Sequence, residues 1–599
     1  MAISAKDLDP KFKFEIANIP GSELLKRCFT CGTCTAICPV SNTFSEYDPR
    51  KIIHMIILGL KDRVLSSENI WRCSHCETCK FSCPQGVHLS EIMDALQHMA
   101  VRDKYVTPDA FEKFGTAPCK AACPAHISIQ GFIGMIAEGR YKEGLRLIKE
   151  TMPFPGICGR ICHHPCEMKC NRGKVDEPLA IEYLKRFLAD RGLSEDIGYV
   201  PETEEKKEEK VAVIGAGPAG LSAAYFLAIK GYPVTVFERL PVAGGMMAVG
   251  IPEYRLPRDI LREEIKTIVD MGVEIKTGVS FGKDITIESL KNESYRAFFI
   301  AVGLHVSRGL NVEGENFDGI IHGINFLRDV SLKGNVTIGA RTIVIGGGNV
   351  AIDVALTALR SGAKEVEMVC LESREEMPAW EHEIKDALDE GIKINNSWGP
   401  KRFIEENGKV KSVEFKRCTA VFDEKGRFNP QYDESELMTL EADTVLLSIG
   451  QACDMSFADG VPDLDVSPRG PSVKDPITLE TNIQGLFVGG DASYGPRSVV
   501  EAVASGREAA ISIDRYLKGE DIGADRPLEW KGIELEPQDV EHLARQQMQR
   551  LSITRRRNSF EEIDSGFSEQ QARLEAGRCL RICGTQSKGN RGQGSGVGE

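Results

Sequence analysis

Two runs of four cysteines near the N-terminus constrain this chain more than any other feature of its sequence. Each run has the spacing Cys-x-x-Cys-x-x-Cys-x-x-x-Cys-Pro, ending at Pro39 in the first run and at Pro84 in the second. With this spacing one short loop wraps three thiolates around a 4Fe–4S cluster, and the fourth cysteine normally ligates the other cluster. The chain is therefore predicted to carry electrons through two 4Fe–4S clusters, with the ligands Cys28, Cys31, Cys34, Cys38, Cys73, Cys76, Cys79 and Cys83.

Zinc sites and disulfide bonds account for these cysteines less well. Structural zinc usually takes two Cys-x-x-Cys pairs rather than two four-cysteine runs in the same register. Disulfide scaffolds are typical of short secreted chains, whereas this chain has 599 residues and most of its 19 cysteines fall in metal-type spacings. The scattered Cys370, Cys418 and Cys453 are interpreted as small buried apolar side chains.

Length and charge narrow the class of protein further. A chain of 599 residues is expected to form roughly three to five domains. The net charge of −14 argues against nucleic acid as a partner, because phosphate binding needs a basic face. The N-terminus lacks the apolar core of a signal peptide, and the most apolar early stretch, residues 52–60, is shorter than the about 20 residues of a membrane-spanning helix. We expect a cytoplasmic protein without a transmembrane segment.

Two helical iron–sulfur domains are expected in the first third of the chain. Residues 1–108 are predicted to form a helical ferredoxin module, in which one helix over 48–65 separates the two cysteine runs, because its apolar residues recur at helical spacing. Residues 109–203 are predicted to form a second helical domain that ends in a charged, exposed linker. Its cysteines also follow a regular spacing: Cys119, Cys123, Cys158, Cys162, Cys166 and Cys170.

A first dinucleotide-binding fingerprint follows the linker. The segment VAVIGAGPAGLSAA begins as a short apolar strand and turns through Gly215, Gly217 and Gly220 into a helix. The first Gly permits the tight turn, the second lets the backbone approach a pyrophosphate, and the third lets helix and strand pack closely. The phosphates then lie at the positive helix N-terminus. The next strand ends at Glu238, where an acid can hold the ribose hydroxyls.

A second fingerprint, TIVIGGGNVAIDVA, has Gly346, Gly348, Asn349 and Ala351 at the turn, and its second strand ends near Glu372. Two fingerprints in one chain imply two nucleotides, a flavin and a nicotinamide. The alternative is a degenerate second unit that binds nothing.

A third signature, TNIQGLFVGGDAS, places Asp491 after a strand and before a helix. Asp491 is expected to hold the ribityl–phosphate region of the flavin, so the chain returns here to the first nucleotide domain. The fold is predicted to be multidomain, with two α-helical iron–sulfur domains followed by an α/β fold of two Rossmann-like domains. The expected parts of the remainder are an FAD-binding domain at 204–327 and 453–525, an NAD(P)H-binding domain at 328–452, and a C-terminal extension at 526–599 with a disordered tail.

Residues 111–525 resemble the small subunit of bacterial glutamate synthase and its relatives, which include the large subunit of NADH-dependent ferredoxin:NADP oxidoreductases and the N-terminal half of dihydropyrimidine dehydrogenase. The segments that carry the resemblance are GGMMAVGIPEYRLPR, with Gly245, and SREEMPAW. The resemblance implies FAD in the first nucleotide domain and NAD(P)H in the second. Residues 22–100 resemble the ferredoxin-type subunit of heterodisulfide reductase through CGTCTAICP, DPRKIIHMIILGLKD and SCPQGVHLSEIM, which also implies two 4Fe–4S clusters.

The cysteines of the second domain depart from this family. An extra Cys-x-x-Cys pair usually precedes the pair that matches Cys119 and Cys123, and it is missing here. The six remaining cysteines suffice for one cluster, so at least one is expected, and a second needs two other ligands. His163 and His164 are either such ligands or polar neighbours of a cluster. Cys579 and Cys583, near the C-terminus, are interpreted as thiols outside any cluster, since two cysteines do not make a site.

The nicotinamide site departs from the family as well. Relatives that use NADPH commonly have Tyr-Arg-Arg where this chain has Cys370, Leu371 and Glu372. A carboxylate beside the ribose suits two free hydroxyls and repels a 2′-phosphate, so NADH is predicted. NADPH is the alternative, because Ala351 at the third position of the turn is typical of NADPH sites and Arg374 is near.

The predicted function is electron transfer between NAD(P)H and a redox partner through FAD and 4Fe–4S clusters, within a larger complex. No catalytic triad is needed, because the cofactors carry the chemistry. The expected partners are heterodisulfide reductase-like subunits, a hydrogenase, a formate dehydrogenase or ferredoxin. One alternative is a glutamate synthase small subunit, against which the N-terminal ferredoxin module counts. The other is a scaffold with unused nucleotide sites, against which the intact glycines count.

Overall fold

The computed structural model describes residues 8–105, 115–194, 197–334, 336–467, 470–524 and 540–581, together with the isolated residues 526, 532 and 537. The chain divides into two compact units. The cysteine-rich unit comprises Met1–Val200, Asp525–Gln547 and Gly566–Glu599, and the nucleotide unit comprises Pro201–Ala524 and Met548–Ser565. The C-terminal extension predicted from the sequence is thus divided between both units, and its tail after residue 581, with Cys583, lies outside the described residues.

The first part of the cysteine-rich unit is built from short helices: α1 (Phe12–Ala17), η2 (Glu23–Arg27), α2 (Thr33–Ala36), α3 (Pro39–Thr43), α4 (Pro49–Leu58), α5 (Lys61–Leu65), η3 (Glu68–Arg72), η4 (Lys80–Ser82) and α6 (Leu89–Arg102). The single helix expected over 48–65 is two helices. Asp48 caps the N-terminus of α4 by accepting from the Lys51 N–H, and Gly59, at φ 81°, ends it in a left-handed conformation that glycine adopts readily. Ile52, Ile53 and Ile56 of α4 lie in the core of this part.

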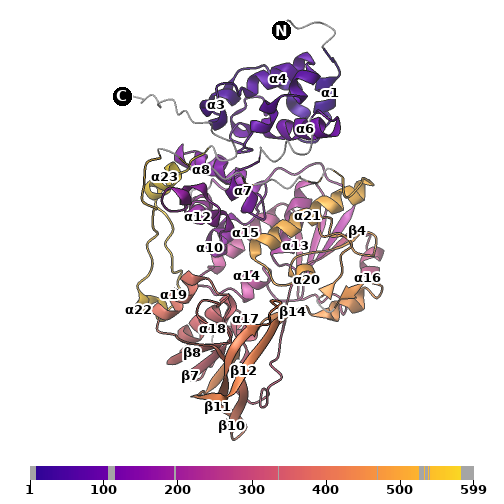
Figure 1. Cartoon of the computed structure of the whole chain (residues 1–599). Coiled ribbons are helices and arrows are strands. Elements are labelled where there is room, and N and C mark those ends of the chain that lie inside the picture. The colour runs from indigo at the N-terminus through magenta and orange to yellow at the C-terminus, as the bar shows by residue number, and fades with distance from the viewer. Residues whose placement is uncertain are drawn as a thin grey trace. The chain divides into compact units, whose positions relative to one another are not determined.

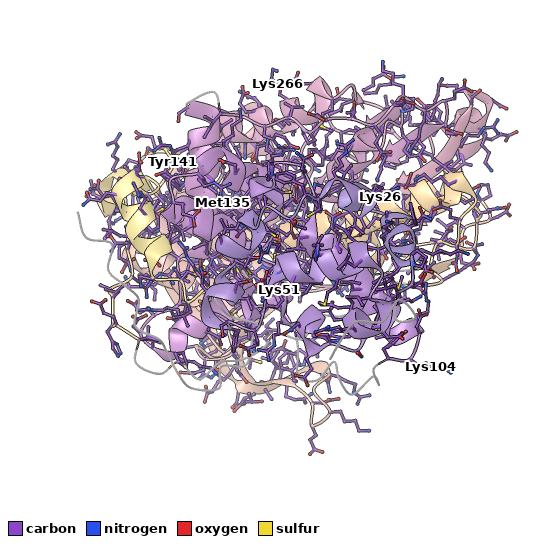
Figure 2. All side chains as sticks on the ribbon, turned by 90° about the horizontal axis from the view of Figure 1, so that it is seen from above. Lys26, Lys51, Lys104, Met135, Tyr141 and Lys266 are labelled. Atoms are coloured by element: carbon purple, nitrogen blue, oxygen red, sulfur yellow. The ribbon has the colours of Figure 1, made fainter. Side chains whose placement is uncertain are left out.

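The second part of this unit holds the helices α7 (Pro118–Ala122), α8 (Ile129–Ala137), α9 (Tyr141–Lys149), α10 (Pro155–Ile161), α11 (Pro165–Met168), η6 (Asn171–Lys174) and α12 (Ile181–Ser194). Helix α23 (Glu569–Gly577), from the C-terminal segment, packs against α8 and α12. Figure 2 shows Tyr141 beside this helix, and its hydroxyl donates to Glu569 Oε1 over 2.7 Å. The C-terminal segment is therefore an integral part of the helical iron–sulfur domain.

The nucleotide unit contains two parallel five-stranded sheets, as the sequence predicted (Figure 1). The first has the order β17-β4-β1-β2-β3. Its elements are β1 (Lys210–Ile214), α13 (Pro218–Ile229), β2 (Val234–Glu238), α14 (Met246–Val249), α15 (Arg258–Asp270), β3 (Glu274–Thr277), α16 (Ile287–Asn292), β4 (Tyr295–Ile300), β17 (Leu486–Val488), α20 (Asp491–Tyr494) and α21 (Val499–Lys518). Strand β17 pairs with β4 far from it in sequence, so the chain returns here to the first sheet.

The second sheet has the order β6-β13-β7-β8-β9. Its elements are β6 (Ile320–His322), α17 (Gly323–Lys333), β7 (Arg341–Ile345), α18 (Asn349–Arg360), β8 (Glu365–Cys370), α19 (Glu381–Asp389), β9 (Lys393–Asn396) and β13 (Thr444–Leu447). Strand β6 lies before residue 328, where the sequence placed the start of this domain, because β6 pairs with β13 and completes the sheet. Most of these strands are buried and apolar, as strands covered on both faces must be.

Three smaller sheets complete the nucleotide unit. The antiparallel strands β10 (Trp398–Glu406), β11 (Lys409–Phe422) and β12 (Phe428–Glu441) form a meander between β9 and β13 (Figure 1). The short strands β5 (Val306–Ser307) and β14 (Gln451–Ala452) pair where the chain enters and leaves the second domain. The rest is β15 (Val466–Ser467), β16 (Gly470–Pro471), η7 (Met455–Gly460) and α22 (Ile553–Arg557). None of the helices in the described ranges is long and apolar enough to cross a membrane.

Candidate cofactor sites

The two N-terminal cysteine runs follow the same backbone path. In the first run Thr30 and Gly32 have positive φ values of 58° and 89°, and in the second run His75 and Glu77, at the matching positions, have 50° and 61°. Non-glycine residues adopt this conformation rarely, and usually where the fold demands it. Both loops are thus wound tightly between their cysteines, as a loop that wraps three thiolates around one centre requires.

The fourth cysteine of each run lies with the other run. Burial raises the pKa of the Cys28 thiol, and the nearby Cys83 and Cys31 add to the rise. Burial likewise raises the pKa of Cys38, and the nearby Cys76 adds to the rise. Two groups result, which we call the outer and the inner group. The outer group is Cys28, Cys31, Cys34 and Cys83, and the inner group is Cys38, Cys73, Cys76 and Cys79.

The two groups differ in exposure at one cysteine each, and the other six cysteines are half-buried. Cys31 is exposed and its neighbour Phe29 is 59% exposed, whereas Cys76 is buried. In the described part of the chain no three His, Cys, Asp or Glu side chains are gathered closely enough to hold a single metal ion. A four-iron cube spreads its thiolates over its corners, so the donor set of each group, four cysteines, is what fits a 4Fe–4S cluster.

Three cysteines of the second domain lie near one buried lysine, and a fourth lies near two of them. Lys185 of α12 is 6% exposed. Burial lowers the pKa of its ammonium group, but the nearby thiols of Cys162, Cys158 and Cys166, with Glu182, raise it above its ordinary value. Cys123 belongs to the same set, because it lies near both Cys162 and Cys166. We call this the Lys185 group: Cys123, Cys158, Cys162 and Cys166. A buried cation at this place would offset the negative charge that a cluster brings.

His164 is paired with a carboxylate. Its Nδ1 lies 3.1 Å from Glu182 Oε2, and its backbone N–H donates to Cys162 Sγ over 3.4 Å. Burial lowers the pKa of His164, but Glu182 outweighs it and raises the value to about 8. The structure thus places His164 beside Cys162 of the Lys185 group, with its Nδ1 turned to Glu182.

The other two cysteines of this domain line a different space. Cys119 and Cys170 border a small cavity together with Cys579 from the C-terminal segment. The sequence interpretation left Cys579 outside any site. One sequence signal pointed to it, because Cys579 and Cys583 have the same Cys-x-x-x-Cys spacing as Cys119 and Cys123.

The two iron–sulfur parts of the cysteine-rich unit are joined by buried polar contacts. Lys120 Nζ donates to the His75 carbonyl over 3.0 Å and to Ser128 Oγ over 3.2 Å, and the Ser128 hydroxyl donates to Glu77 over 2.6 Å. A Cβ at Gly131 of α8 would lie 2.1 Å from the Cys76 carbonyl oxygen, so the helix touches the inner-group loop directly.

The first nucleotide turn leaves space at one glycine and none at the others. A Cβ at Gly220 would lie 2.0 Å from the Gly215 carbonyl oxygen, and one at Gly215 would lie 2.5 Å from that of Ala301. At Gly217 the nearest atom to such a Cβ is 3.9 Å away. Gly217 caps α13 without a side-chain hydrogen bond, so the first N–H groups of the helix are available to a phosphate.

Three further predicted residues meet at this turn. Glu238 ends β2 with 6% exposure, and its carboxylate accepts the Ala216 N–H over 2.7 Å and the Leu240 N–H over 2.8 Å. A Cβ at Gly245 would lie 2.7 Å from Gly217 Cα. Asp491 begins α20 directly after Gly490, and a Cβ at Gly490 would lie 3.0 Å from Ala219 Cβ. Burial raises the pKa of Asp491 to about 7. The four sequence elements assigned to FAD thus surround the N-terminus of α13.

The second nucleotide turn likewise has one crowded glycine and one open glycine. A Cβ at Gly346 would lie 2.4 Å from the Ser448 carbonyl oxygen, whereas one at Gly348 would meet nothing within 4 Å. Gly348 caps α18 without a side-chain hydrogen bond, and Ala351 is fully buried. The segment SREEMPAW folds back on this turn, since the Ala379 N–H donates to the Gly347 carbonyl over 3.2 Å and the Trp380 N–H to Asn349 Oδ1 over 3.1 Å.

Glu372 lies at this turn, just after β8. Its Oε2 is 2.8 Å from the position that a Cβ on Gly347 would take, and burial raises the pKa of its carboxyl group. The guanidinium of Arg374 pairs with Glu381 over 2.7 Å. The charge next to the second turn is therefore a carboxylate.

The fold and these sites define a FAD- and NAD(P)H-dependent iron–sulfur oxidoreductase. Three family profiles match the chain: pyridine nucleotide-disulphide oxidoreductase over residues 209–506, dihydropyrimidine dehydrogenase domain II with a 4Fe–4S cluster over 112–197, and a 4Fe–4S dicluster domain over 24–87.

Similar curated proteins are subunits of oxidoreductases. The NADP(+)-dependent formate dehydrogenase subunit beta of Moorella thermoacetica is 42% identical over 512 residues, which cover 79% of this chain and 71% of that one. The NADPH-Fe(3+) oxidoreductase subunit beta of Geobacter sulfurreducens is 37% identical over 504 residues, covering 78% and 75%. The NAD-dependent dihydropyrimidine dehydrogenase subunit PreT of Escherichia coli O157:H7 is 35% identical over 409 residues, covering 67% and 92%. This chain belongs to their family of NAD(P)-dependent flavin and iron–sulfur oxidoreductase subunits.

Proposed function

We propose that this chain is the NADH-linked electron-transfer subunit of a larger redox complex. The observation that carries the proposal is the joint presence of two complete nucleotide turns and of separate four-cysteine groups in one chain. When bound, FAD exchanges a hydride with the nicotinamide, and the clusters carry the electrons singly to or from the partner. A glutamate synthase small subunit is not favoured, since none of the relatives named above is one.

The first turn is assigned to FAD. The N–H groups at the start of α13 would hold the pyrophosphate, with Gly217 leaving space for its approach, and Glu238 would hold the ribose hydroxyls. Gly215, Gly220 and Gly245 keep the surrounding backbone close enough to form this space. Asp491 would lie against the ribityl–phosphate region.

The second turn is assigned to NADH. The N–H groups at the start of α18 would hold its pyrophosphate beside Gly348, and Glu372 would accept from the two ribose hydroxyls. A 2′-phosphate would bring like charges together in a partly buried place, which is costly. The names of the relatives include both NADP(H) and NAD, so family membership does not indicate which nucleotide this chain prefers. The assignment to NADH therefore rests on Glu372.

The N-terminal module is assigned to electron exchange with a partner protein. The loop of the inner group contacts α7 and α8, whereas Cys31 of the outer group and Phe29 are exposed. The outer group is therefore the point at which electrons pass to or from a partner. The partner belongs to the class of redox subunits, such as a formate dehydrogenase, a hydrogenase, a heterodisulfide reductase-like subunit or ferredoxin.

The nucleotide assignment is tested by comparing kcat/KM for NADH and NADPH with an artificial electron acceptor. We expect NADH to be preferred by about tenfold or more, and Glu372→Arg to reverse the preference. The matched control is Glu375→Arg, which makes the same charge change at an exposed position nearby and should leave the ratio unchanged. A wild-type preference for NADPH, or an unchanged ratio in Glu372→Arg, would reject the assignment.

A further inference from the structure

A buried tyrosine lies among the cysteines of the inner group. Tyr47 lies in the segment between α3 and α4 and is 2% exposed. Its hydroxyl forms a hydrogen bond with the side chain of Cys73, and the thiols of Cys38 and Cys79 are also near it. The phenol is thus beside three of the four cysteines of the inner group. The sites described above give this side chain no role.

The residues that precede Tyr47 are held against the helix that ends at Cys73. Helix η3 has Cys73 at its C-terminal cap, and Arg72 is its last residue. Arg72 pairs with Glu46 over 3.4 Å, and its guanidinium lies over the Phe44 ring, 5.1 Å from the centroid. The segment that carries the phenol is therefore fixed to the residue next to the thiol that the phenol contacts.

The residue that follows Tyr47 is tied to the first cysteine run. Asp48 Oδ1 accepts from Thr35 Oγ1 over 2.7 Å, and the Arg50 N–H donates to the same Thr35 oxygen over 3.1 Å. Thr35 directly follows Cys34 in the first run. The backbone on both sides of Tyr47 is thus anchored, one side to each run. A donor held in this way orients a metal ligand without a further loss of freedom.

The direction of the hydrogen bond follows from the chemistry of the two groups. A cysteine loses its proton when it binds iron, so the sulfur of Cys73 can only accept and the hydroxyl of Tyr47 must donate. Burial raises the pKa of Tyr47 well above its ordinary value, and the neighbouring thiols add to the rise. The phenol therefore keeps its proton. Hydrogen bonds to the ligand sulfurs are among the factors that set the potential of a 4Fe–4S cluster.

The matching hydroxyl at the outer group is in a different environment. Thr33 Oγ1 lies 3.3 Å from Cys31 Sγ, and Cys31 is exposed. Water can take the place of a hydroxyl at such a position. Tyr47, in contrast, belongs to the apolar core of the module, where a hydrogen bond is stronger and water does not replace it. The hydroxyl of Tyr47 should thus affect its cluster more than that of Thr33.

We propose that the hydroxyl of Tyr47, by donating to the sulfur of Cys73, raises the reduction potential of the 4Fe–4S cluster of the inner group. On reduction the cluster takes up one electron, while the hydroxyl keeps its proton and stabilises the added negative charge through the sulfur. Tyr47 thus acts through a ligand and is not one itself. The inference rests on the proposed function only in that the inner group holds a cluster.

The test is a redox titration of the full, cluster-loaded chain without oxygen, followed by electron paramagnetic resonance of the reduced clusters. Tyr47→Phe keeps the ring and removes the hydroxyl. At a fixed potential the ratio of reduced to oxidised cluster should fall about tenfold for one cluster, which is a midpoint lower by about 59 mV. Iron and sulfide content should stay at the wild-type level. The control is Tyr105→Phe, which removes a hydroxyl of the same module that donates to Asp62, and no midpoint should change.

The shift is assigned to one cluster by combining Tyr47→Phe with the loss of a ligand. In the Cys28→Ala background, which lacks a ligand of the outer group, Tyr47→Phe should still lower one midpoint. In the Cys73→Ala background it should change none, because the acceptor of the hydrogen bond is gone. A shift of the same size in the Cys73→Ala background would overturn the proposal.

A second measurement on the wild-type chain does not depend on the folding of a variant. Biosynthetic incorporation of 3-fluorotyrosine makes each phenol a stronger donor with little change in shape, so the midpoint of one cluster should rise. Tyr47→Phe should abolish this rise, and Tyr105→Phe should not. Unchanged midpoints in the fluorinated wild type, or in Tyr47→Phe with full iron and sulfide, would overturn the proposal. These midpoints are measured without nucleotide or partner, so a failure of the proposed function would not alter them.

Discussion

Arg255 donates to Asp353 Oδ2 over 2.7 Å and so joins the IPEYRLP segment of the first nucleotide domain to helix α18 of the second. The same guanidinium donates to Glu383 of α19 over 2.6 Å. Burial lowers the pKa of Arg255, but the two carboxylates outweigh it and raise the value. Arg360, stacked 4.1 Å over the Tyr254 ring, adds a second link at the same place. These contacts link the two nucleotide domains within the unit.

Replacing Arg255 should therefore destabilise the nucleotide unit. Arg255→Met leaves Asp353 and Glu383 buried without their cation, and we expect a loss of about 3 kcal/mol in the free energy of unfolding, measured by denaturant titration. Lys266→Met is the control, because Lys266 pairs with Asp270 on the surface and is 60% exposed (Figure 2). It should cost less than about 1 kcal/mol. Equal losses of unfolding free energy in both variants would show that the ion pairs of Arg255 contribute no more to stability than the surface pair of Lys266.

Gly348→Ala should weaken the binding of NADH without destabilising the fold. A Cβ there meets nothing in the protein but would occupy the space through which the pyrophosphate approaches. We expect an unchanged melting temperature and a KM for NADH raised by about tenfold or more. Gly346→Ala, which has a carbonyl oxygen 2.4 Å from the new Cβ, should instead lower the melting temperature. An unchanged KM in Gly348→Ala would contradict the placement of the nucleotide.

Asp491 should make the flavin-free protein less stable as the pH rises. Its folded-state pKa of about 7 is raised by burial above the ordinary value of about 4. Its contribution is therefore complete below that ordinary value and is lost as the pH rises through 7. The melting temperature of the flavin-free Asp491→Asn variant, relative to wild type, should rise between pH 6 and pH 8. A constant difference across this range would show that Asp491 is already ionised in the folded protein.

Phe29 should contribute to the reduction of a partner protein and not to the oxidation of NADH. It is exposed two residues before Cys31 of the outer group, which we assign to electron exchange with a partner. Phe29→Asp should slow reduction of a partner protein and leave NADH oxidation with a small artificial acceptor unchanged. Phe428→Asp, an exposed phenylalanine on the meander, is the control. Equal partner rates for the two variants would exclude Phe29 from the docking surface.

The features predicted from the sequence are those set by local spacing. Cysteines three residues apart and glycines at a strand-to-helix turn determine their own loop geometry, so the two cysteine runs and the two nucleotide turns could be proposed as sites from the sequence alone. The approach of Cys579 to Cys119 was missed, because it depends on the ion pairs of Asp176 with arginines from two distant segments. The meander β10–β12 was also missed, and so was the break at Gly59, since an apolar stretch alone does not show where a helix ends.

The central claim is that the N-terminal groups connect the nucleotide unit to a partner. It is tested most directly with Cys28→Ala combined with Cys73→Ala, by following flavin reduction by NADH and reduction of the partner subunit in the same anaerobic sample. The account predicts that the flavin is reduced at the wild-type rate and that the partner is reduced at least about a hundredfold more slowly. Reduction of the partner at the wild-type rate by this variant would contradict it.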